Sequence, residues 1–251
     1  MITLTQIAWC ILGFGMLLGT QRMFRRELQG FLMALTRNPT ISLTLYAVLF
    51  APGVAVHEFS HWIVARLLGV RTISLSLIPR KVSGDQLRLG YVETERTDPI
   101  RSALIGVMPL LSGTLLLSLL TLNRLGLEPI VGALSEAGYL GVLQTLARMP
   151  NVPDVGLWLY LAVAISNTML PSAADRSAWL IAGLIIVAIA AFMIWSGWGL
   201  RGVAWLSDVL SEIPTRLAAV FSLTAALNLA LAIILGVGGR VLLSLRRLFS
   251  G

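Results

Sequence analysis

Long apolar runs, separated by short polar breaks, make up most of the chain. A run of about 18 or more apolar residues is long enough to cross a hydrocarbon core of about 30 Å as a helix. The pattern predicts about six membrane-spanning helices. They lie at about 2–20, 41–68, 103–122, 155–170, 172–200 and 217–239. We therefore expect an all-α polytopic membrane protein in which 1–251 forms a single membrane domain.

The period of the pattern changes from helical to two after the second apolar run. Ile73, Leu75 and Leu77 alternate with serines, and a second alternating run follows at 87–91, beyond a turn at 83–85. Period two predicts a small membrane-associated β-hairpin over 71–95. Two interpretations stay open: the hairpin is an amphipathic loop that rests on the membrane surface, or its edge pairs with an extended substrate.

Two other segments are more polar than their neighbours. The segment 21–40 carries four arginines, and Asn38-Pro39 predicts a turn at its end. In 124–150, charged side chains interrupt an apolar run. Because a charge at mid-bilayer costs about 2.5–3.5 kcal/mol, we expect 124–150 to be an interfacial helix rather than a span.

The composition is typical of a membrane protein and limits the classes of partner that we expect. Only 12% of the residues are charged, whereas a soluble domain averages about 25%. The net charge of +7 indicates loops that contact the anionic headgroups of the lipid bilayer, and no nucleic-acid partner is expected. Cys10 is the single cysteine, so we expect neither a disulfide framework nor a thiolate metal site. The first apolar run lacks a basic flank, so we expect an uncleaved helix there rather than a signal peptide.

Both histidines of the chain lie in the second apolar run. His57 and His61 are four residues apart, with Glu58 between them. On a helix these two positions share a face, so the imidazoles can bind one zinc ion while Glu58 acts as general base. The alternative is a pair of structural histidines that form hydrogen bonds with their neighbours. An ionisable cluster inside an apolar helix favours the metal site.

A catalytic zinc ion needs a third protein ligand and an open position for water. With no third histidine, we expect a carboxylate, and Asp175 lies in a polar break between two apolar runs. If each run crosses the membrane, Asp175 lies on the same face as the histidine end of the second run. We therefore predict His57, His61 and Asp175 as ligands of Zn²⁺.

Asn167 lies eight residues before Asp175 in an apolar run. Its side-chain amide could donate to the oxyanion that forms during hydrolysis, which would make it a catalytic residue. The alternative is that Asn167 only forms a hydrogen bond to another helix.

These residues resemble the site-2 protease family of intramembrane zinc metalloproteases. Its members carry His-Glu-x-x-His in one membrane helix and, further on, Asn-x-x-Pro-x-Pro-x-x-Asp-Gly, whose aspartate is the third zinc ligand. The segment His57-Glu58-Phe59-Ser60-His61 matches the first motif in full, and Asn167 and Asp175 match the ends of the second. The second motif differs from the family at Leu170, Ser172 and Arg176.

The resemblance implies a core at about 41–200, flanked by helices at 1–20 and 217–239. Within the core, 106–110 is similar to the glycine- and proline-containing helix that packs beside the zinc helix. The face that bears 69–102 would be cytosolic, as would both ends of the chain.

The resemblance also implies an intramembrane zinc endopeptidase. It would hydrolyse a peptide bond in or near a transmembrane segment of a membrane-protein substrate. We expect a multi-pass integral protein of a prokaryotic cell membrane. Two alternatives stay open: a non-catalytic membrane scaffold or regulator on the same fold, and an unrelated zinc protease whose third ligand is a glutamate.

Overall fold

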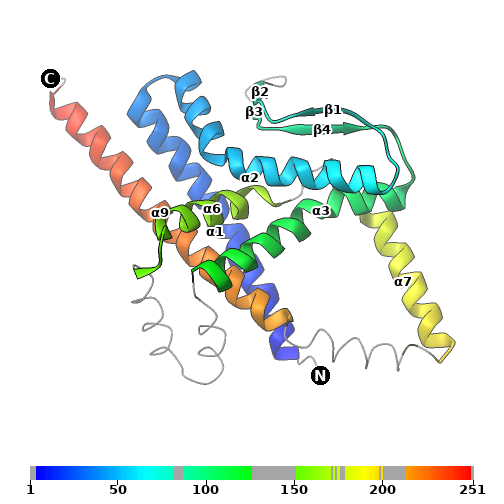
Figure 1. Ribbon diagram of the computed structural model, residues 1–251. Helices are drawn as coiled ribbons and strands as arrows, with labels where there is room; N and C mark the ends of the chain where they lie inside the picture. Colours follow the sequence, from blue (N-terminus) through cyan, green and yellow to red (C-terminus); the bar gives the residue numbers. More distant parts are fainter. Residues whose placement is uncertain are drawn as a thin grey trace.

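The computed structural model describes residues 4–81, 87–125, 151–170, 172, 174–175, 179–197, 199 and 213–249. The helices among them are α1 (Leu4–Thr36), α2 (Pro39–Leu67), α3 (Pro99–Ser118), its π-helical extension η1 (Leu119–Arg124), α6 (Val155–Thr168), α7 (Trp179–Trp195) and α9 (Ile213–Phe249). Four of these units, α1, α2, α3 with η1, and α9, are long and apolar enough to cross a membrane. The predicted helical architecture is therefore confirmed in this coarser form (Figure 1).

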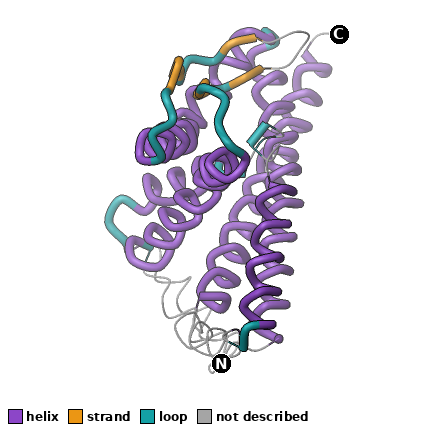
Figure 2. The backbone as a smooth tube through the Cα atoms, turned by 90° about the vertical axis from the view of Figure 1, so that its right-hand side faces the viewer, coloured by secondary structure: helices purple, strands orange, loops and turns teal. Residues whose placement is uncertain are grey.

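The longest helices, α1 and α9, lie side by side and run in the same direction (Figures 1 and 2). Near their first residues, Gln6 Nε2 donates to Thr215 Oγ1 at 3.0 Å. Near their last residues, the Arg246 guanidinium donates to the Leu35 carbonyl at 3.2 Å, which satisfies an end carbonyl of α1. Among the described residues, four helices have the length and composition of a membrane span, and the predicted count of six spans stays a prediction.

The first helix is longer than the predicted run at 2–20, because its buried face continues beyond that point. Phe24, Leu28 and Leu32 recur at every fourth position and are buried, whereas the arginines of this segment are exposed or half-buried. The helix ends only before Arg37, whose φ of 54° is left-handed. The segment 21–36 is thus an amphipathic continuation of α1.

The helix α2 begins at the predicted turn. The Asn38 side chain accepts hydrogen bonds from the backbone N–H groups of Thr40 (2.9 Å) and Ile41 (3.3 Å), and Pro39 takes the first helical position. Pro52 lies inside α2 and removes a backbone hydrogen bond, and the helix bends in its middle (Figure 1). The helix α2 packs against α3, α6 and the hairpin, and both histidines lie in its second half.

The hairpin predicted over 71–95 is confirmed. β1 (Thr72–Ser76) pairs with β4 (Tyr91–Thr94), and β2 (Arg80–Lys81) pairs with β3 (Leu87–Arg88), both antiparallel. Ile73 is 64% exposed and Leu75 37% exposed, while Ser74 between them is half-buried. The strand β1 therefore turns its apolar side chains away from the helices, whereas Leu89, which follows β3, packs against the helical core. The predicted turn at 83–85 lies outside the described residues.

Glycines allow α2, α3 and α6 to approach closely. A Cβ atom at Gly53 of α2 would collide with the Ala164 backbone of α6, and one at Gly113 of α3 would collide with Met169. Small residues at such crossings let helix backbones pack together in a membrane. This packing holds α2, α3 and α6 together.

The helix α7 begins later than the predicted run at 172–200. As a result Asp175, which the predicted run at 172–200 includes, lies in a turn before α7. Pro171 and Arg176 lie outside the described residues, as does 126–150, so the predicted interfacial helix there stays a prediction.

Candidate metal centre

Three predicted ligands meet between α2 and the turn that precedes α7. His57 Nε2 lies 3.3 Å from His61 Nε2 and 3.8 Å from Asp175 Oδ2, and His61 Nε2 lies 3.2 Å from Asp175 Oδ1. A tetrahedral zinc ion with bonds of about 2.0–2.2 Å separates its ligand atoms by about 3.3–3.6 Å. The spacing of the two imidazoles and the carboxylate, 3.2–3.8 Å, is close to this range. It confirms that the three side chains form a group that could hold a metal.

The hydrogen bond of His61 Nδ1 determines which ring nitrogen of His61 can act as a metal ligand. His61 Nδ1 lies 2.9 Å from the backbone carbonyl oxygen of Ile105, which can only accept a hydrogen bond. A proton therefore belongs on Nδ1, and in the neutral ring Nε2 turns its lone pair toward His57 and Asp175. Three electron-pair donors at such short range repel one another unless a cation or a proton lies between them. The donor set, two imidazole nitrogens and one carboxylate oxygen, suits zinc.

The Asp175 carboxylate is oriented by its own turn and by α3. The Ser172 backbone N–H donates to Asp175 Oδ2 (2.6 Å), and the Asp175 backbone N–H donates to Ser172 Oγ (3.3 Å). On the other side, the Asp175 carbonyl lies directly against Gly106 of α3, where a side chain would collide with it. Ser172, one of the departures from the family motif, thus helps to hold the ligand.

Glu58 lies on α2 beneath the hairpin. Its side chain is buried, at 7% exposure. A Cβ atom at Gly90, in the link between β3 and β4, would lie 2.9 Å from Glu58 Cγ and 3.0 Å from Glu58 Oε1. The hairpin backbone therefore covers the predicted general base, a contact that the sequence did not predict.

Asn167 has both of its N–H donors engaged within the helices. Its Nδ2 donates to the Val163 carbonyl and to Asn228 Oδ1 of α9, each at 2.9 Å. The side chain is 4% exposed and that of Asn228 is fully buried. This geometry favours the alternative of an interhelical hydrogen bond, and the predicted oxyanion role stays a prediction. The lone amide of Asn228 inside an apolar run was the available sequence signal for this contact.

Ser60 links α2 to α3. Its Oγ donates to the Val56 carbonyl and forms a hydrogen bond with Ser112 Oγ.

No family model, curated protein or solved structure matches the chain. The resemblance to the site-2 proteases therefore rests on the two sequence motifs.

Proposed function

We propose that this protein is an intramembrane zinc endopeptidase. The observation that carries the proposal is the convergence of His57, His61 and Asp175 from two distant parts of an apolar chain. Two histidines and one carboxylate are the ligand set of several zinc hydrolases, and they leave a fourth position for water. The His-Glu-x-x-His spacing adds a carboxylate, Glu58, next to the first ligand.

The roles of the residues follow from their chemistry. Zinc, when bound, lowers the pKa of its water toward about 7 and polarises the peptide carbonyl. Glu58 would accept a proton from the attacking water and pass it to the leaving amine. His61 is held by the Ile105 carbonyl and Asp175 by Ser172, so both ligands are positioned before the substrate binds.

The substrate we propose is a transmembrane segment of another membrane protein. Four helices are apolar and long enough to cross a bilayer, and this supports a substrate that reaches the ligands of α2 from within the membrane. A peptide bond in a helix is shielded by its own hydrogen bonds, so the segment must unwind locally before hydrolysis. The hairpin covers Glu58, so the unwound chain would approach beside Gly90.

The metal is the first thing to test. We expect about one zinc ion per chain in the purified protein and a large loss of zinc in His57→Ala and Asp175→Ala variants. Glu27→Gln is a matched control, since Glu27 packs against Gly236 of α9, away from the ligands. Full zinc content in Asp175→Ala would overturn the proposed ligand set and favour a glutamate ligand instead.

A non-catalytic scaffold on the same fold is the second candidate. The observations that favour it are the hairpin over Glu58 and the engaged donors of Asn167. The scaffold hypothesis predicts a zinc-loaded protein that does not cleave unfolded fluorescent casein in detergent. Cleavage that depends on Glu58 would exclude it.

A further inference from the structure

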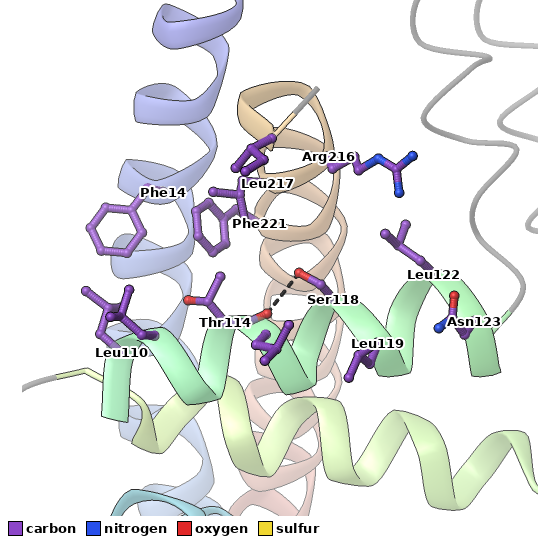
Figure 3. Close-up of a pocket in the computed structure, with 13 residues that line it drawn as sticks. Phe14, Leu110, Thr114, Ser118, Leu119, Leu122, Asn123, Arg216, Leu217 and Phe221 are labelled. Carbon is purple, nitrogen blue, oxygen red and sulfur yellow. Dashed lines mark hydrogen bonds between the residues drawn. The ribbon is translucent and has the colours of Figure 1, made fainter. Parts of the chain in front are cut away.

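A second feature of the structure is an apolar groove far along α3 from the metal ligands (Figure 3). It lies between α3 with η1 and the first turns of α9, and Phe14 of α1 contributes to its wall. Its volume is about 620 Å³. We call it the α3–α9 groove.

The wall of the α3–α9 groove is apolar even where it carries hydroxyl groups. Ser118 Oγ donates to the Thr114 carbonyl at 2.8 Å, so its proton is used inside α3 (Figure 3). Phe14 and Phe221 pack with their ring centroids 5.4 Å apart. Leu119, at 46% exposure, lines the open side. Such a wall suits a hydrocarbon chain.

The charged side chain among the lining residues, Arg216, lies at one end of the groove. Arg216 and Asn123 lie at this end, and Leu110 lies at the other (Figure 3). Arg216 is in the first turn of α9, so its guanidinium lies where a membrane helix begins. Lipid phosphates are found at that depth, and arginine binds phosphate through paired N–H donors.

The length of the groove suits a single acyl chain. From Leu110 to Asn123 the groove extends about 20 Å at 1.5 Å per residue. One leaflet of a bilayer has hydrocarbon about 15 Å thick, so an acyl chain fits this length.

We propose that the α3–α9 groove binds an anionic phospholipid, with one acyl chain along α3 and the phosphate at Arg216. The site requires that the protein lies in a membrane, and this requirement is part of the proposed function. It does not depend on zinc or on peptide hydrolysis. The shape of the groove suits a single acyl chain, and the position of Arg216 favours a negatively charged headgroup.

The test is a lipid titration of the intact protein in detergent, read by native mass spectrometry. The probes are phosphatidylglycerol and phosphatidylcholine with identical acyl chains. We expect the protein to prefer phosphatidylglycerol by about fivefold, the equivalent of about 1 kcal/mol for one basic residue. Arg216→Gln should abolish the preference, whereas Arg22→Gln, on the exposed face of α1, should keep it. Leu119→Trp should weaken binding of both lipids by filling the groove.

Equal affinity for both lipids in the natural protein would overturn the proposal, as would an unchanged preference in Arg216→Gln. Displacement of phosphatidylglycerol by excess inorganic phosphate would also overturn it, by assigning the site to a free anion. Zinc content is measured in the same samples. A protein without zinc that still prefers phosphatidylglycerol would refute the proposed protease and leave the lipid site standing.

Discussion

Gly106 of α3 lies directly against the backbone carbonyl of Asp175, so that even a methyl group at position 106 would occupy the place of that carbonyl. The contact joins α3 to the turn that carries the third metal ligand. The Asp175 side chain then reaches His61 at 3.2 Å. Gly106 is thus a positioning residue for the metal centre, although it has no ligand atom of its own.

Gly106→Ala should therefore weaken zinc binding. The added methyl group must displace the Asp175 backbone, and loss of such outer support typically lowers metal affinity about 10–100-fold. Zinc affinity and the visible absorption of the cobalt-substituted protein both report on the ligands.

Gly113→Ala is the matched control, because it adds the same methyl group to the same helix against Met169. It should lower thermal stability while leaving the zinc affinity and the cobalt spectrum unchanged. Equal loss of zinc in both variants would mean that general packing, and not the contact with Asp175, is responsible.

Glu58→Gln should keep the bound zinc and lose cleavage of casein by about 10²–10⁴-fold. The amide has nearly the same shape as the carboxylate but cannot accept the proton of the water. Metal analysis and a cleavage assay on the same preparation give both quantities. Retention of full activity would remove Glu58 from the mechanism.

Gly90→Ala tests the contact between the hairpin and the general base. A methyl group at Gly90 would meet Glu58 Cγ at 2.9 Å, so either the hairpin or the carboxylate must move. A displacement of about 1 Å near a reacting group can cost about 100-fold in rate. We expect at least about a tenfold loss of cleavage with zinc retained. Gly156→Ala, where nothing lies within 4 Å, is the control and should be neutral.

Asn167→Ala and Asn228→Ala separate the two roles of Asn167. Each variant leaves one buried amide without its partner, so each should lower the free energy of unfolding by about 1–3 kcal/mol. Because both N–H donors of Asn167 are engaged, we expect the turnover of the zinc-loaded protein to stay the same in both. A loss of about 10²–10³-fold in Asn167→Ala alone would instead assign it to the oxyanion.

The group of His57, His61 and Asp175, which could hold a metal ion, was predictable from the sequence because its signals are local. The spacing of His57 and His61 places both on one face of any helix, and the polar break at Asp175 stands out against apolar neighbours. The hairpin was equally visible, since period two extends over both of its strands. Local patterns of this kind do not depend on which elements the helices pack against.

Contacts between distant segments could not be predicted in this way. Gly106 and Gly90 are recognisable as small residues, but only the fold shows that Asp175 and Glu58 lie against them. The length of α1 was underestimated because arginines on its outer face masked the buried series at Phe24. A hydrophobic profile averages the two faces of a helix, so it ends such a helix too early.

The common direction of α1 and α9 has a consequence for the sidedness of the protein. If both helices cross the bilayer, an odd number of crossings must separate them. Leu4 and Phe249 then face different compartments, contrary to the shared cytosolic location that the family resemblance implied. A reagent that cannot permeate the bilayer would label only one of these two ends in sealed vesicles.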